Sequence, residues 1–173
     1  MKGIVINCSN NASVTITGAS DNVNHAGGIS GNNFYMGLVS DCQNSGPVNC
    51  SGARSNDAGG IAGNTNNGEV LNSKNTVAVT ASGQAGSGNW AGGITGGTRS
   101  DAKISNCENS GDVTAYGSPI SNNAGGIAGS TGYDKVIITY CINKGTVTGK
   151  NGSFQIYVGG IVGCLNRDSS ISD

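Results

Sequence analysis

The sequence predicts an all-β protein: a β-solenoid of about five coils, with roughly three short parallel strands in each coil. Two short motifs recur with a period of about 33 residues, and the composition is unsuited to helices. Glycine accounts for 31 of the 173 residues, charged residues make up 11 %, and no apolar stripe follows the helical period of 3.6. A fixed period of this length indicates a stacked repeat architecture. We expect residues 1–173 to form a single repeat domain, cut from a longer array.

The first motif is Gly-Gly-Ile, which recurs at intervals of 32, 33, 33 and 34 residues. Glycine pairs suit a corner where the chain turns close to its neighbours. The isoleucines are expected to stack as an apolar column in the core, because equivalent residues of successive coils align about 4.8 Å apart. The column contains Ile29, Ile61, Ile94, Ile127 and Ile161.

The second motif has the form Cys-x-Asn, followed by a valine. Amides stacked in register can hydrogen-bond along the solenoid axis and satisfy the backbone of a turn. We therefore expect an asparagine ladder at one corner, formed by Asn10, Asn44, Asn75, Asn109 and Asn143. The valines are expected to form a second apolar column, formed by Val14, Val48, Val79, Val113 and Val147.

Within one unit, three β-type runs are expected at residues 103–106, 112–115 and 124–128, separated by Asn, Ser and Gly turns. Three strands per coil predict a triangular cross-section.

Four of the six cysteines occupy the first position of the second motif, where Ser73 replaces cysteine in one unit. No pair has CxxC spacing, so zinc and redox motifs are not indicated. We expect small buried thiols; disulfides between adjacent coils remain an alternative, although in-register side chains suit disulfide torsions poorly. The stacked cysteines are Cys8, Cys42, Cys107 and Cys141.

The residue before each Ala-Gly-Gly or Val-Gly-Gly changes from unit to unit, whereas its neighbours hardly change. We call it the variable column; it contains His25, Asp57, Trp90, Asn123 and Tyr157. A core could not stack these side chains without burying Asp57 unpaired. We therefore expect the Gly-Gly corner to break the alternation and turn this column to solvent. With Tyr116 and Phe154 from the preceding variable loops, it is the candidate ligand-binding edge.

The two motifs together resemble the GLUG-motif repeats of bacterial cell-surface proteins. Residues 125–129 read GGIAG and residues 136–147 read VIITYCINKGTV. Isoleucine with Ala, Ser or Thr replaces the commoner Leu-Val. The resemblance implies an extracellular or cell-surface location, in adhesin-like chains or accessory regions of extracellular peptidases. It does not imply a catalytic activity in the repeat.

Several classes of function are disfavoured by the composition. A net charge of −1 without a basic cluster argues against nucleic-acid binding, and no apolar run is long enough to span a membrane. His25 is the only histidine, and no two acids align at matched positions of adjacent units. We therefore expect no enzyme activity, no cofactor and no metal site.

Two main functions remain open. One is adhesin-like binding of a glycan or protein through the variable loops, and the other is a passive stalk. End-to-end self-association through terminal coils is a third. Ice binding is a minor alternative, because the threonines after the valine column recur only in part.

Overall fold

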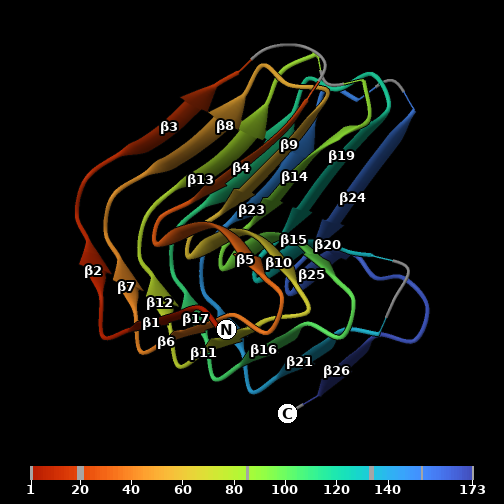
Figure 1. Ribbon diagram of the computed structural model, residues 1–173. Helices are drawn as coiled ribbons and strands as arrows, with labels where there is room; N and C mark the ends of the chain where they lie inside the picture. The colour runs from red at the N-terminus through yellow and green to blue at the C-terminus, as the bar shows by residue number, and fades with distance from the viewer. Residues whose placement is uncertain (1, 19–21, 85, 133–134, 153, 173) are drawn as a thin grey trace.

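The computed structural model describes residues 2–18, 22–84, 86–132, 135–152 and 154–172. These residues form 26 parallel strands and no helix. The chain winds as a β-solenoid in which every strand pairs in parallel with its equivalent about one period away (Figure 1). The predicted fold class is therefore confirmed.

Each coil contains five strands, so the prediction of three strands and a triangular cross-section is wrong. The run at 103–106 is one strand, and the run at 112–115 is another. The run at 124–128 is divided by its Gly-Gly corner between two strands, and a two-residue strand at the asparagine position was not expected. The strands form five sheets, which we call A to E in chain order.

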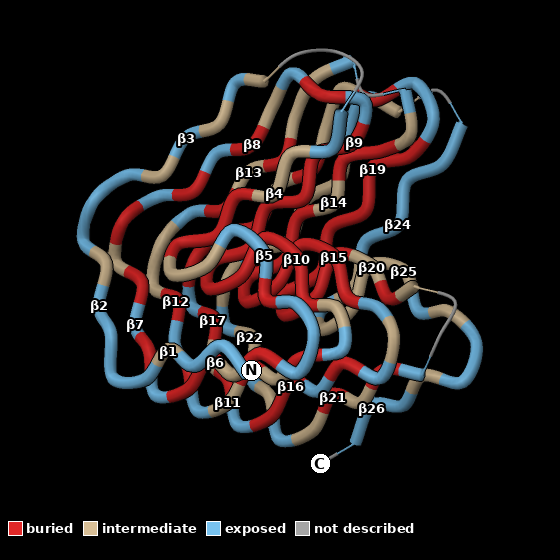
Figure 2. Tube along the Cα trace, viewed as in Figure 1, coloured by how far each residue is buried: buried red, intermediate tan, exposed pale blue. Residues whose placement is uncertain are grey.

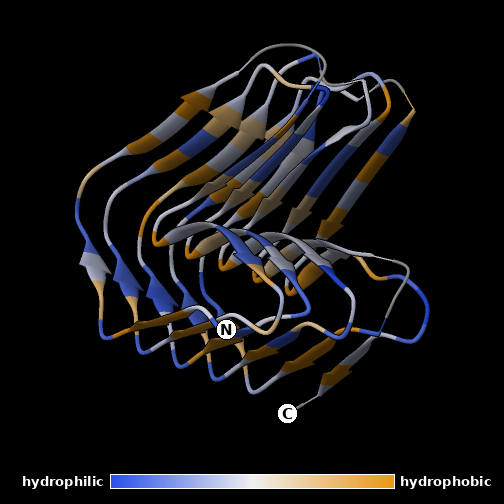
Figure 3. Cartoon of the chain, viewed as in Figure 1, coloured by the Kyte–Doolittle hydropathy of each residue, from blue (hydrophilic) through white to orange (hydrophobic). Residues whose placement is uncertain are grey.

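Sheet A carries the aliphatic residue three positions before each cysteine position. In this sheet Val39, Val70 and Ile104 are fully or almost fully buried and pair in register. Hydrophobic residues accordingly colour its strands in Figure 3. Its strands are β1 (Ile4–Ile6), β6 (Leu38–Ser40), β11 (Glu69–Leu71), β16 (Lys103–Ser105), β21 (Ile137–Thr139) and β26 (Ser170–Ser172).

Sheet B consists of two-residue strands that carry the predicted asparagine ladder. The Nδ2 group of each asparagine donates to Oδ1 of the next at 2.8–3.0 Å. The same Nδ2 group also donates to a backbone carbonyl two residues ahead, as from Asn75 to Val77 at 2.7 Å. The strands are β2 (Ser9–Asn10), β7 (Gln43–Asn44), β12 (Lys74–Asn75), β17 (Glu108–Asn109) and β22 (Ile142–Asn143).

Sheet C carries the valine column. Val48, Val79 and Val113 are fully buried, and the residues two positions later in the same strands, Cys50 and Ala81, are buried beside them. The strands are β3 (Val14–Thr17), β8 (Val48–Ser51), β13 (Val79–Ser82), β18 (Val113–Tyr116) and β23 (Val147–Lys150).

Sheet D packs against sheet C and contributes buried alanines to the same core cluster. It also contains a second asparagine ladder, which the sequence analysis missed: Asn56 donates to Asn89 at 2.8 Å, and Asn89 to Asn122 at 3.2 Å. The strands are β4 (Val23–Gly27), β9 (Ser55–Gly59), β14 (Gly88–Gly92), β19 (Ser121–Gly125) and β24 (Gln155–Gly159).

Sheet E closes the coil and packs against sheet A. The predicted isoleucine column lies in that second core cluster, with Ile61, Ile94 and Ile127 fully buried. The strands are β5 (Ser30–Phe34), β10 (Ala62–Asn66), β15 (Thr95–Arg99), β20 (Ala128–Thr131) and β25 (Val162–Cys164).

The Gly-Gly corner between sheets D and E bends the coil inward and separates the two core clusters. A Cβ atom on Gly59 would collide with the carbonyl oxygen of Ala62, and one on Gly60 with that of Gly93. Glycine is therefore required by the close approach of neighbouring backbones, as the sequence indicated. Burial is concentrated in the middle coils, whereas the first and last coils expose much of their surface (Figure 2).

All six cysteines are free, which agrees with the expectation of thiols. Cys42, Cys50 and Cys107 are buried, Cys141 is half-buried, and Cys8 in the first coil is exposed. Burial raises the pKa of the Cys50 thiol to about 12. The buried thiols therefore fill the core and are poor nucleophiles.

Candidate functional site

The residues of the variable column stack in register on sheet D. His25 pairs in register with Asp57, Asp57 with Trp90, Trp90 with Asn123, and Asn123 with Tyr157. The residues on either side of it face the interior. The alanines that follow belong to the core cluster, and the asparagines that precede reach sheet C, as Asn89 does through a 2.7 Å bond to the Tyr116 carbonyl. Alternation along the strand therefore points the variable column away from the core.

The expectation that the whole column faces solvent is wrong for two of its members. Asp57 is 0 % exposed and Asn123 is 4 % exposed, whereas Tyr157 is 39 % exposed. The cause is the inward bend at the Gly-Gly corner, which places the outer face of sheet E against the outer face of sheet D. The part of the column from Trp90 to Tyr157 thus faces a re-entrant groove and not an open surface.

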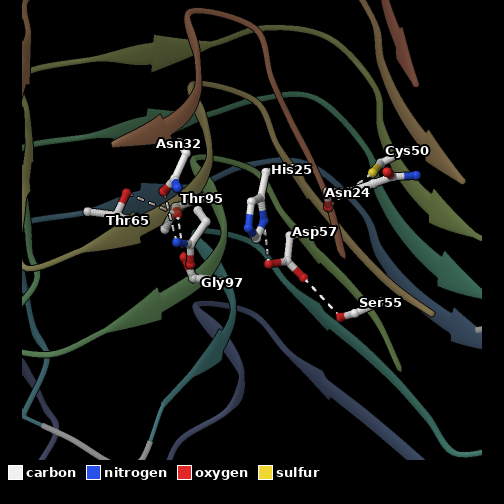
Figure 4. A network of polar contacts seen from close by, with 10 residues as sticks. Asn24, His25, Asn32, Cys50, Ser55, Asp57, Thr65, Thr95 and Gly97 are labelled. Carbon is white, nitrogen blue, oxygen red and sulfur yellow. Dashed lines mark hydrogen bonds and ion pairs between the residues drawn. The ribbon is translucent and has the colours of Figure 1, made fainter. Parts of the chain in front are cut away.

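His25 and Asp57 form a close pair at one end of this column (Figure 4). His25 Nδ1 lies 2.9 Å from Asp57 Oδ2, and Ser55 Oγ lies 3.5 Å from Asp57 Oδ1. The two atoms lie within ion-pair distance, although they are not aligned as a hydrogen bond. Burial raises the pKa of Asp57, and the His25 contact opposes that rise only in part.

This pair supplies only half of a hydrolytic triad. In such a triad the carboxylate orients the imidazole, and the imidazole in turn contacts a nucleophile. Here the Ser55 hydroxyl contacts the carboxylate, which is the wrong end of the pair. Among the described residues, no group of three or more His, Cys, Asp or Glu side chains is arranged to hold a metal ion.

A groove with a volume of about 580 Å³ lies between sheets D and E. Sheet D contributes Trp90, Ser121, Asn123, Gln155 and Tyr157 to its lining. Sheet E contributes Gly97, Thr98, Arg99, Ser130, Thr131 and Cys164. Three of the five members of the variable column therefore line it.

Trp90 and Arg99 come from opposite walls of this groove in the same coil. The guanidinium carbon of Arg99 lies 5.6 Å from the centre of the Trp90 ring, within cation–π range. Arg99 is an exposed residue and Trp90 is half-buried. The contact fixes a positive charge and an aromatic surface side by side at the groove.

Four predicted site residues lie outside the groove lining, namely His25 and Asp57 of the pair described above together with Tyr116 and Phe154. Tyr116 ends β18 on sheet C, where Lys150 Nζ lies 5.4 Å above its ring. Phe154 precedes β24 and is 79 % exposed. Residues 20, 21, 85 and 153 of the variable loops lie outside the described residues.

The contribution of sheet E was not expected from the sequence. Arg99 pairs in register with Asn66 in the preceding coil, and Asn166 follows β25 at the far end of the groove. Neither belongs to a recurring motif, so the repeat pattern gave no reason to select them. Their placement became predictable only once the strand after the Gly-Gly corner and its inward bend were known.

Comparison with known proteins identifies one structural relative. The chain is similar to the crystal structure of a protein from Bacteroides ovatus described as a "putative immunoglobulin A1 protease", with a TM-score of 0.70 and 24 % sequence identity. The match covers 99 % of this chain and 56 % of that one, so the chain spans just over half of that structure. At this identity the likeness concerns the fold alone.

No family model matches the chain, and no curated protein matches it. The described residues also contain no helix that is long and apolar enough to cross a membrane.

Proposed function

We propose that this chain is a non-catalytic binding module of a bacterial cell-surface protein, built from GLUG-type repeats. Its ligand is an extracellular glycan or protein, contacted through the groove and the variable loops beside it. The observation that carries this proposal is the groove between sheets D and E, because it gathers the residues that vary between otherwise uniform coils.

The dimensions and lining of the groove suit a small or extended ligand. Ligand sites typically enclose roughly 300–1,000 Å³ and combine aromatic surface with a few polar groups. Here about 580 Å³ is lined by Trp90 and Tyr157 together with the amides of Asn123 and Gln155. Aromatic faces and amides are the groups that contact the apolar faces and hydroxyls of sugars.

Between the two ligand classes, the shape of the groove favours a glycan. A stable protein interface needs about 800 Å² on each partner and a buried apolar centre. The groove is a strip bounded by two sheets, and most of its lining side chains are small or polar.

The proposal is tested with a glycan array probed by wild-type protein and Trp90→Ala. We expect wild-type binding to a subset of glycans and a loss of about tenfold or more in affinity for Trp90→Ala, as for a central aromatic contact. Tyr140→Ala is the matched control, because it removes an exposed aromatic side chain after β21, away from the groove lining and the variable loops. Equal binding by wild type and Trp90→Ala would contradict the proposal.

A passive stalk is the second candidate, and the axial asparagine ladders favour it. They join every coil to the next and would resist extension along the axis. A blank array for wild type and both variants is the result expected of a stalk. Ice binding gains less support, because Asn49 interrupts the threonine column between Thr15 and Thr80.

End-to-end self-association is favoured by apolar surface on the outer coils. Val158 of the last coil is 49 % exposed, whereas its partner Ala124 is fully buried. Ile4 in the first coil is 59 % exposed. A molecular mass in solution that stays monomeric as concentration rises would argue against this alternative.

A further inference from the structure

The charge of the groove points to the chemistry of its ligand. Among the described residues that line it, Arg99 alone carries a full charge. The described carboxylates form no ion pair with Arg99, whose side chain is exposed at the end of β15. The nearby acid, Asp57, is fully buried and occupied by His25. The charge presented to a ligand is therefore positive.

Arg99 is also held in place before any ligand arrives. Its guanidinium carbon lies 5.6 Å from the centre of the Trp90 ring, a contact that restricts an otherwise flexible side chain. A guanidinium carries a planar fork of N–H donors that matches a carboxylate with two parallel hydrogen bonds. A preorganised fork loses less entropy on binding than a mobile one.

The aromatic residues define a direction for the ligand. Trp90 and Tyr157 occupy the same column two coils apart, which corresponds to ~9.6 Å at ~4.8 Å per coil. That separation is comparable with the length of a disaccharide unit. Asn123 lies between the two rings in register, and Gln155 and Asn166 line the same stretch. A sugar chain along the solenoid axis would meet both rings and the intervening amides.

We propose that the groove binds an acidic oligosaccharide, one with uronic-acid units, lying along the solenoid axis with a carboxylate on Arg99. Trp90 and Tyr157 stack on sugar faces, and the amides of Asn123 and Gln155 meet hydroxyl or acetamido groups. This inference rests on the proposed binding function and narrows its ligand to a chemical class.

The test is calorimetric titration with a hyaluronan tetrasaccharide, in which glucuronate alternates with N-acetylglucosamine, and with its methyl ester. The ester removes the negative charges and keeps the sugar faces. Wild type is expected to bind the acid more tightly than the ester. Arg99→Gln is expected to lower affinity for the acid by about tenfold, as for loss of a charged hydrogen bond, and to leave affinity for the ester unchanged.

Lys150→Gln is the matched control. Lys150 also lies over an aromatic ring, that of Tyr116 at 5.4 Å, but outside the groove lining. Its removal should leave affinity for the acid within about twofold of wild type, because exposed charges beyond the site are screened by salt. Circular dichroism and the melting temperature of each variant report whether it has folded.

The outcomes separate this inference from the proposed function. Equal affinity for the acid and the ester, or unchanged affinity of Arg99→Gln for the acid, overturns the acidic-ligand assignment. The binding function still stands if Trp90→Ala weakens array binding. Binding only to a sulfated glycan overturns the assignment to carboxylate. No binding to either tetrasaccharide overturns this inference, and the proposed function falls with it only if the array is also blank.

Discussion

The asparagine ladder of sheet B and the variable column of sheet D both stack in register, but their side chains interact along the axis in different ways. At the sheet B corner every coil presents asparagine, from Asn10 to Asn143, and each amide is bonded to the next. On sheet D the variable column changes chemistry at every coil, from His25 to Tyr157. A repeated residue satisfies its own polar groups along the axis, whereas unlike neighbours cannot form one continuous chain of bonds.

Stability and recognition are therefore assigned to different columns of the solenoid. The ladder amides use their hydrogen bonds on each other and on the turn backbone, so they stabilise the stack and offer little to a ligand. The variable column instead leaves aromatic faces and amides at a groove that the inward bend creates. Breaking either column should therefore have effects of different kinds.

The largest effect on stability is expected from Asn75→Ala in the middle of the ladder. Asn75 is fully buried, donates to Val77 and Asn109, and accepts from Asn44. Its loss leaves the Val77 carbonyl without this hydrogen bond and should lower the free energy of unfolding by about 2–4 kcal/mol. Urea denaturation followed by circular dichroism measures the change.

Asn123→Ala provides the comparison in the variable column. Asn123 accepts a single hydrogen bond from Ser121 Oγ at 2.7 Å, so its removal should cost about 1 kcal/mol or less. Equal destabilisation by the two variants would show that the two columns do not differ as described.

A smaller effect, dependent on pH, is expected at Asp57. Burial raises the pKa of its carboxyl in the folded protein, above about 3.9 in the unfolded chain. The residue therefore favours folding while it is protonated, and that contribution is lost as pH rises through the folded pKa. Asp57→Asn keeps a neutral polar group there, so its stability relative to wild type should be higher at pH 7 than at pH 4.

Paired urea titrations of wild type and Asp57→Asn at the two pH values measure this difference. A constant difference between them would mean that His25 and Arg99 compensate the buried charge fully.

The sequence predicted the parts of this fold that repetition specifies. The period, the isoleucine and valine columns, the asparagine ladder and the close-packed glycine corner are each visible as a residue recurring at a fixed interval. Five sheets per coil were not predicted, because a two-residue strand such as Lys74–Asn75 leaves no alternation to detect.

The candidate site was predictable only in part, for a related reason. Variation itself singled out Trp90, Asn123 and Tyr157, which do line the groove. Burial of Asp57 and the approach of Arg99 depend on the inward bend between sheets D and E, a tertiary feature with no local sequence signal. We expected the variable column to face solvent, whereas the bend places part of it in a groove.

The most direct measurement of the central claim is an NMR titration of the labelled protein with the hyaluronan tetrasaccharide. We expect chemical-shift changes concentrated on the Trp90 indole N–H and the side-chain amides of Asn123 and Gln155. The side-chain amide signal of Asn75 in the ladder should not change. Shifts that avoid the groove and cluster on sheet B or sheet C would contradict the assignment of recognition to the variable column.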